Sequence, residues 1–215
     1  MEFYAHNIIR EELENYLINN IRTVYENFDR AHDIRHFDEV FLSVLRCLKS
    51  GMINDVNPEI MLAAAAYHDV GCIINRDDHE INSVYILNKD KKMKEFFDED
   101  EIAHISKIIT HHRKSKYKDD DNNFDIYELL LRDADSISTY RRARALYRVV
   151  GFNIDNYKDE GWTKVFDRIK RRLSTRRFEW SPKTEVMKEM YKYPDIYTEW
   201  KDFEIITVMN HLWND

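Results

Sequence analysis

A chain of 215 residues has the length of one ordinary domain, with or without a small extension, and can bury a substantial core without disulfide bonds. The formal net charge of −7 disfavours a surface built for the phosphate backbone of nucleic acid, although a local basic patch could still hold one phosphate group. Two cysteines, Cys47 and Cys72, have no CxxC partner, so the sequence suggests neither a disulfide framework nor a thiolate zinc site. We expect a cytoplasmic protein without membrane association, because no apolar run approaches the ~20 residues of a membrane-spanning helix.

Apolar residues recur at intervals of three and four, and only four glycines and three prolines interrupt the chain. This pattern predicts a nearly all-α protein. We expect a first helix over about residues 7–28 and a second helix that Asp33 caps and that ends at Gly51. His36 then lies in the first turn of the second helix, whereas His32 is expected to face solvent.

The Asn-Pro pair at 57–58 is typical of a helix start. The run 60–67 that follows is apolar on every side, as in a fully buried helix. We expect His68 and Asp69 to close this helix and Gly71 to break it.

Two further helices precede a charged segment. One is expected over about residues 78–88, and Asp100 then caps an amphipathic helix that delivers His111 and His112 at its end. The stretch 114–123 is polar and heavily charged, which predicts an exposed loop at the mouth of a site.

The helical pattern resumes at residue 124 and continues until Gly151. Residues 157–213 hold three further helix candidates and all four tryptophans, and this aromatic end indicates core packing or a contact between copies of the chain. The sequence has no internal repeat and no long linker. We therefore expect one helical domain over 1–150 and a helical C-terminal extension over 151–215 packed on it.

The dipeptide His68-Asp69 at the end of a buried helix is the feature that most suggests chemistry. Adjacent side chains on a helix point about 100° apart, so both can reach one centre only where the helix ends at a cavity. A carboxylate there costs several kcal/mol unless it is paired or bound to a metal, although the dipeptide could also be polar filler. His36 and Asp135, each near the end of a predicted helix, favour the metal, because imidazole and carboxylate together suit divalent Mn, Fe, Ni, Co, Zn or Mg.

Three segments, in this order, resemble the signature of the HD superfamily of metal-dependent phosphohydrolases, in which an isolated His is followed by His-Asp and later by Asp. The segments are AHDIRHF at 31–37, AAAYHDVG at 64–71 and DADSI at 133–137. The resemblance implies an HD-type helical bundle with a divalent metal, and its implied ligands are His36, His68, Asp69 and Asp135, with Asp69 able to bridge a second ion. It also implies that water activated by the metal hydrolyses a phosphate ester or anhydride. Our hypothesis for the substrate is a phosphorylated small molecule, a nucleotide.

Two more histidines fit the wider pattern of this superfamily. His79 and His112 either contact the phosphate or protonate the leaving group, or they hold a second metal as in binuclear members. Helical geometry lets one of two adjacent histidines face inward, and we favour His112 over His111. The lysine that follows His-Asp in many members is absent, so Arg113 and Arg142 become candidates for phosphate binding, since a guanidinium matches phosphate bidentately.

Two alternative functions stay open. The first is a binuclear cyclic-nucleotide phosphodiesterase, although the short spacing from His-Asp to His79 counts against the cyclic-dinucleotide enzymes. The second is a degenerate domain that senses a nucleotide without turnover, which the missing lysine favours. The complete ligand set favours the enzyme, in which Asp69 orients the nucleophile. Asp133 is expected either to orient a ligand from behind or to be exposed.

Overall fold

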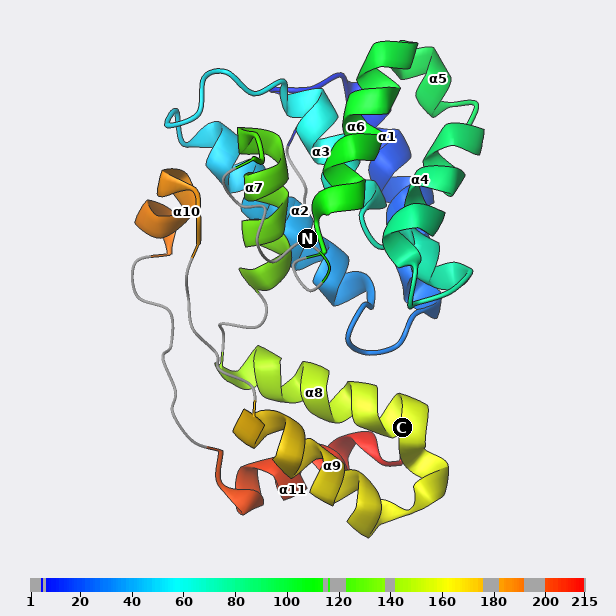
Figure 1. The fold of residues 1–215 in the computed structure, drawn as a ribbon, viewed down its shortest axis with the longest axis vertical. Helices are drawn as coiled ribbons and strands as arrows, with labels where there is room; N and C mark the ends of the chain where they lie inside the picture. Colours follow the sequence, from blue (N-terminus) through cyan, green and yellow to red (C-terminus); the bar gives the residue numbers. More distant parts are fainter. Residues whose placement is uncertain are drawn as a thin grey trace.

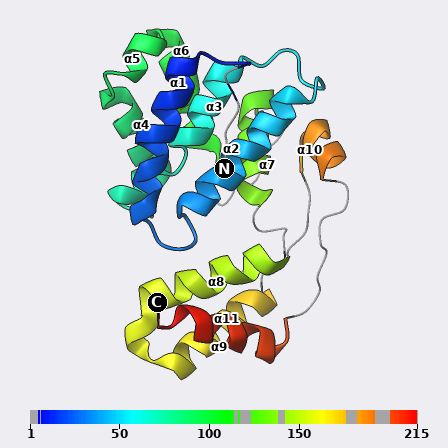
Figure 2. The ribbon, with the colours of Figure 1, turned by 180° about the vertical axis from the view of Figure 1, so that it is seen from behind.

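The computed structural model describes residues 5, 7–113, 116, 123–137, 142–175, 182–191 and 200–214, apart from the side chains of residues 142 and 175. Within these residues every regular element is a helix, and the prediction of an all-α protein is confirmed. The helices form two groups, one above the other in Figures 1 and 2. We call them the N-terminal unit and the C-terminal unit.

The N-terminal unit contains most of the helices. In chain order they are α1 (Glu11–Tyr16), a π-helical segment (Leu17–Ile21), a 3-10 segment (Arg22–Asn27), α2 (Ile34–Lys49), α3 (Pro58–Tyr67), a 3-10 turn (Val70–Ile73), α4 (His79–Lys89), α5 (Met93–Phe96), α6 (Glu99–His111) and α7 (Ile126–Ser136). The C-terminal unit consists of α8 (Arg142–Tyr157), a 3-10 turn (Lys158–Glu160), α9 (Trp162–Thr175) and α11 (Asp202–Leu212). Between α9 and α11 the chain returns to the N-terminal unit, where α10 (Glu185–Met190) packs near α2 and α7 (Figure 1).

Side-chain caps fix where the helices that carry the site begin. The Asp33 carboxylate accepts hydrogen bonds from the backbone N–H groups of residues 35 and 36, as its position predicts. Asn57 accepts from the backbone of residue 59, with proline in the first turn of α3. The prediction of Asp100 as the next cap is wrong, because Asp98 caps α6 in a reciprocal capping box with Glu101.

The sequence predicts one continuous helix over residues 7–28, and the structure differs. The α-helical part begins at Glu11, and π-helical and 3-10 segments follow it. The buried apolar side chains on this stretch recur at every fourth position, namely Leu13, Leu17, Ile21 and Tyr25. Because an α-helix has 3.6 residues per turn, such a stripe drifts around it, and a wider π turn offsets the drift.

The predicted helix from residue 124 to Gly151 is also wrong. The chain forms two helices instead, α7 and α8, and residues 138–141 lie outside the described residues. Gly151 lies inside α8, where an added Cβ would sit 2.6 Å from the Cβ of Arg30. This glycine therefore serves a close contact between α8 and the N-terminal unit and does not break the helix.

Each unit has its own hydrophobic core. All residues of α3 from Ile60 to Tyr67 are buried, which confirms the prediction of a central buried helix. A second cluster lies between α8, α9 and α11, around Val150, Ile169 and Met209. The domain boundary expected at residue 150 falls within α8. The buried apolar residues of this helix belong to the second cluster from Leu146 onward, and Ala145 does not. The division at residue 150 stays a prediction.

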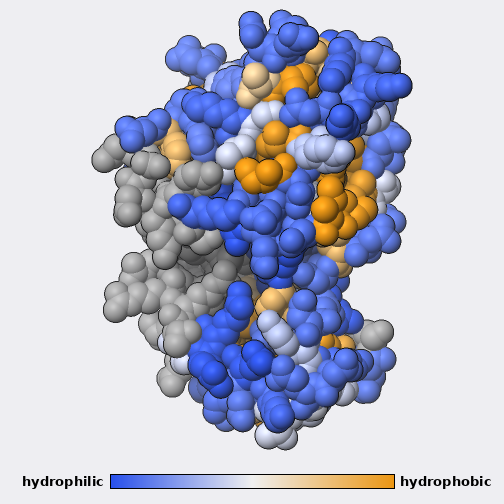
Figure 3. Space-filling view, turned by 45° about the vertical axis from the view of Figure 1, so that its right-hand side comes forward, coloured by the Kyte–Doolittle hydropathy of each residue, from blue (hydrophilic) through white to orange (hydrophobic). Residues whose placement is uncertain are grey.

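Ion pairs join the two units. Arg30 donates from its backbone N–H and its guanidinium to the carboxylate of Asp155, at 2.8 and 2.6 Å. The guanidinium of Arg144 lies 3.3 Å from Asp33 and 3.0 Å from Glu39. Figure 3 shows apolar patches on the N-terminal unit, while the C-terminal unit is mostly hydrophilic on the same face. Among the described residues, no helix combines the length and the apolar character needed to cross a membrane.

Candidate metal centre

The end of α3 brings His68 and Asp69 to one point. His68 is the C-cap residue that follows α3, and Asp69 leaves the helix at φ −112° and ψ 3°, so its side chain turns back towards that of His68. The backbone here is held from two sides. The Ser83 hydroxyl donates to the His68 carbonyl at 2.9 Å, and the Asp69 N–H donates to the Tyr25 hydroxyl at 3.2 Å.

Two histidines face one oxygen of the Asp69 carboxylate, and Asp135 lies beside one of them. The Nε2 atoms of His36 and His68 lie 3.4 and 3.2 Å from Asp69 Oδ2 and 3.3 Å from each other. Asp135, in the last turn of α7, places Oδ1 3.1 Å from His36 Nε2. The side chains of both histidines are fully buried, and that of Asp135 is 27 % exposed. These residues form the first group, whose open side is at Asp135.

A second group gathers around the other oxygen of the same carboxylate. His79, the first residue of α4, places Nε2 3.2 Å from Asp69 Oδ1, and His112, at the end of α6, places Nε2 3.4 Å from it. The two Nε2 atoms are 3.1 Å apart. The Cys72 thiol lies close to Asp69 and His79, so that one potential ligand atom from each falls within 4.8 Å of the others. Asp69 therefore stands between two sets of nitrogen ligands.

Three of the four histidines are oriented by backbone carbonyl groups. A carbonyl oxygen only accepts, so each contacting Nδ1 carries the proton and each neutral ring presents an Nε2 lone pair to the centre. In the His79–His112 pair two such lone pairs face each other at 3.1 Å, and they repel unless a proton or a cation lies between them. The carbonyl contacts are His68 Nδ1 with Ala65 O at 2.8 Å, His79 Nδ1 with Arg76 O at 2.7 Å and His112 Nδ1 with Ile109 O at 2.6 Å.

The electrostatics of the cluster keep both carboxylates ionised. Burial raises the pKa of Asp69, but electrostatic interactions with His68 and His79 and further histidine hydrogen bonds outweigh it and hold the pKa well below the usual range. Burial also raises the pKa of Asp135, but a hydrogen bond with His36 outweighs it, so the pKa of Asp135 is lowered. Burial lowers the pKa of His79, which favours its neutral ring, whereas at His68 the interaction with Asp69 outweighs burial and raises the pKa. Anionic oxygens and neutral imidazoles are the ligand forms that divalent metals bind.

Gly71 sets the distance between the end of α3 and α4. A Cβ at this position would lie 2.1 Å from the His79 carbonyl oxygen and 2.4 Å from the Ser83 nitrogen. The Gly71 N–H donates to the Ser83 hydroxyl at 2.8 Å. The glycine thus lets α4 approach closely enough for His79 to reach Asp69.

The remaining predicted site residues lie elsewhere. His111 is turned away from Asp69 and pairs with the buried Glu128. Arg113 donates to the Asp77 carbonyl and lies 3.3 Å from Glu80, so its described contacts are on the α4 side of the centre. Arg142 begins α8, and its side chain lies outside the described residues, as does most of the predicted loop 114–123.

Two expectations of solvent exposure are wrong, those for His32 and Asp133. His32 precedes α2 and does not face solvent, because its side chain is only 13 % exposed and its ring packs edge-on against His36 with centroids 6.0 Å apart. Asp133 is fully buried and accepts hydrogen bonds from the backbone of Lys183 and from the backbone and hydroxyl of Thr184, at 2.8–3.0 Å. It anchors the segment before α10 to α7, and no pattern in the local sequence indicates this partner.

Comparison with known proteins agrees with this geometry. A family model described as the HD domain matches residues 32–140, just over half of the chain. The chain belongs to the HD domain family. Neither the curated proteins nor the solved structures that were searched contain a match. The matched region runs from the residues before α2 to those after α7 and includes every histidine and aspartate of both groups, whereas α8–α11 lie beyond it. An HD domain with a buried His/Asp cluster points to a metal-dependent phosphohydrolase.

Proposed function

We propose that this chain hydrolyses a phosphate ester or phosphoanhydride of a small molecule, with nucleotides as the substrate class, and that it does so with two divalent metal ions bridged by Asp69. The observation that carries the proposal is the arrangement of the four Nε2 atoms. They converge in two pairs on the two oxygens of one carboxylate, with N–N separations of 3.3 and 3.1 Å. Backbone carbonyls orient three of the rings, which is the usual support for histidines that bind metals.

The donor set fits divalent metals. The first group offers two imidazoles and two carboxylates, from His36, His68, Asp69 and Asp135. The second offers two imidazoles and the shared carboxylate, with a thiol near by, from His79, His112, Asp69 and Cys72. Mixed imidazole and carboxylate ligands suit Mn, Fe, Co, Ni or Zn. Ions held here would supply an activated water and would neutralise charge on the phosphoryl group.

The residues of the chain then have separate tasks. Asp69 holds the two groups in register, since each of its oxygens faces one pair of histidines. Asp135 lies at the open side, so a phosphoryl group approaches past it, and the buried histidines exclude water from the other sides. His79 and His112 carry their protons on Nδ1, so as neutral rings they cannot donate from the Nε2 atoms that face the centre. This favours ligation of a second ion over the role of general acid for both residues.

Metal analysis combined with activity tests the proposal. Purified protein is assayed for bound metals and for hydrolysis of phosphomonoesters, nucleotides and cyclic nucleotides with Mn²⁺, Fe²⁺, Co²⁺, Ni²⁺, Zn²⁺ and Mg²⁺. We expect two ions per chain, about one in His79→Ala, and no activity in Asp69→Ala. His111→Ala is the matched control, because the neighbouring ring faces Glu128 and its loss should leave the metal content unchanged. Activity that survives Asp69→Ala, or a metal content that His79→Ala does not change, would refute the mechanism.

A further inference from the structure

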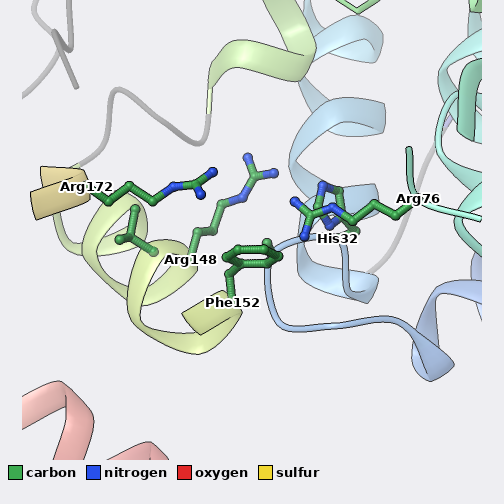
Figure 4. A pocket seen from close by; sticks show the side chains of 7 residues that line it. His32, Arg76, Arg148, Phe152 and Arg172 are labelled. Carbon is green, nitrogen blue, oxygen red and sulfur yellow. The ribbon is translucent and has the colours of Figure 1, made fainter. Parts of the chain in front are cut away.

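A basic cavity lies beside the metal centre, where the two units meet. Its volume is about 50 Å³, and its walls come from the segment before α2, the loop before α4, and helices α8 and α9. In Figure 4, Arg148 and Arg172 extend from the C-terminal unit, while Arg76 and His32 approach from the N-terminal unit, with Phe152 below them. The cavity exists only because the two units are docked, and the C-terminal residues lie outside the matched HD domain.

Positive charge accumulates around this cavity. The guanidinium carbons of Arg76 and Arg172 lie 4.0 and 5.0 Å from the centre of the same Phe152 ring, so one aromatic side chain supports two cations. Burial and the charge of Arg76 lower the pKa of Arg172, and burial lowers the pKa of Arg148. Carboxylates lie near by as well, because Asp29 is 3.4 Å from Arg76 and 3.0 Å from His32, and Asp135 interacts electrostatically with Arg148. Three guanidinium groups that crowd one small cavity form a favourable site for an anion.

Residues that line the cavity also interact with residues of the metal centre. His32 lines it, and its ring contacts that of His36, a ligand of the first group. Arg76 lines it as well, and its carbonyl orients His79 in the second group. Arg148 interacts electrostatically with Asp135, the ligand that is exposed at the open side. An anion in the cavity would therefore lie next to a group bound at the metals.

We propose that this cavity binds a phosphate group other than the one attacked at the metal centre, so that the substrate is a compound with two or more phosphate groups, such as a nucleoside diphosphate or triphosphate. The inference rests on the proposed function. The cavity volume agrees with the size of a phosphate, because a cavity of about 10–15 Å³ is enough to hold one water. The site therefore holds about four waters, or one tetrahedral anion.

Arg172→Gln tests the cavity, because Arg172 belongs to neither hydrophobic core and its substitution should not unfold the protein. The matched control is Arg168→Gln on the same helix, which removes an equal charge from an arginine paired with Glu160. Calorimetry on the metal-loaded protein measures binding of inorganic pyrophosphate and of inorganic phosphate. We expect Arg172→Gln to weaken pyrophosphate binding about tenfold to a hundredfold, with little change for phosphate, which needs the metals alone. Arg168→Gln should resemble the wild type, and Arg76→Gln, from the opposite wall, should resemble Arg172→Gln.

Kinetics separate this inference from the proposed function. Arg172→Gln should lower kcat/KM for nucleoside diphosphates and triphosphates about tenfold or more and leave that for monophosphates unchanged. The inference is overturned if pyrophosphate binds wild type, Arg172→Gln and Arg168→Gln with equal affinity. Hydrolysis of phosphate compounds by the wild type would still support the hydrolase in that case. An equal loss of phosphate and pyrophosphate binding, with unchanged kinetics, also overturns it, because the cavity then takes a free anion. Pyrophosphate binding that depends on Arg172, without turnover of any phosphate compound, supports the anion site and refutes the hydrolase.

Discussion

Gly71→Ala is the substitution for which the structure makes the sharpest prediction. The new Cβ would lie 2.1 Å from the His79 oxygen, 2.4 Å from the Ser83 nitrogen and 2.7 Å from the Asn82 Cβ. All three atoms belong to the backbone of α4 or stand next to it, so the contact is relieved only if the helix moves. Overpacking of this kind costs about 1–3 kcal/mol, and a lost hydrogen bond from Gly71 N–H to Ser83 adds about 1 kcal/mol. We expect a loss of about 2–4 kcal/mol in the free energy of unfolding.

Two measurements check this prediction. Thermal unfolding should show Tm lowered by roughly 5–15 °C for a chain of this size. Metal analysis should show loss of the second ion, because the displaced helix carries His79 away from Asp69. Gly51→Ala is the control: φ is +72° there but no atom lies within 4 Å of the new Cβ, so the cost is about 1 kcal/mol and the metal content stays unchanged. If Gly71→Ala is as stable as Gly51→Ala and keeps both ions, the reasoning about this contact is wrong.

Asp133→Ala should lower the free energy of unfolding by about 3 kcal/mol, because it leaves the buried donors of Lys183 and Thr184 without their acceptor. Limited proteolysis should then cut near these residues. A urea midpoint equal to that of wild type would contradict this prediction. Burial raises the pKa of Asp29, but a hydrogen bond with His32 and nearby positive charge outweigh it and lower the pKa to about 2. Such a group stabilises the fold by about 2 kcal/mol above its unfolded pKa of about 4, and this stability is lost as the pH falls towards 2. The difference in unfolding free energy between wild type and Asp29→Asn should therefore shrink over that pH range. A difference that stays constant would contradict the lowered pKa of Asp29. Chelation should lower Tm and added Mn²⁺ should restore it, since a site filled at 100 times Kd adds about 2.7 kcal/mol; a Tm that neither treatment moves would argue against the metals.

Local signals in the sequence account for much of the candidate site. The Asp33 cap fixes the start of α2 and so the position of His36, and the glycine after His68-Asp69 marks where α3 ends. Both features depend on residues close together in the chain, where capping and backbone preferences decide the structure. The structure brings these side chains together with Asp135, while their role as metal ligands stays a prediction.

The basic cavity could not be predicted in the same way. Arg76, Arg148 and Arg172 come from three segments that no local periodicity relates, and each sits in a stretch that also reads as a solvated helix face or loop. Their meeting depends on how the C-terminal unit docks, which a few long-range contacts such as the Arg30–Asp155 pair determine. Sequence patterns carry little information about contacts of this separation.

The residues Asp133 and Asp135 show how the segment beyond the HD domain is connected to its chemistry. Side chains two positions apart on a helix point about 200° apart, so α7 directs Asp135 to the metal centre and Asp133 to the opposite side. There Asp133 holds the segment before α10, which lies beyond the matched family region. Because one rigid helix carries both contacts, a change that loosens the Thr184 contact can shift α7 and with it the ligand at the open side. We therefore expect the C-terminal part of the chain to act on the site in two ways, through the position of Asp135 and through the arginines of the proposed anion cavity.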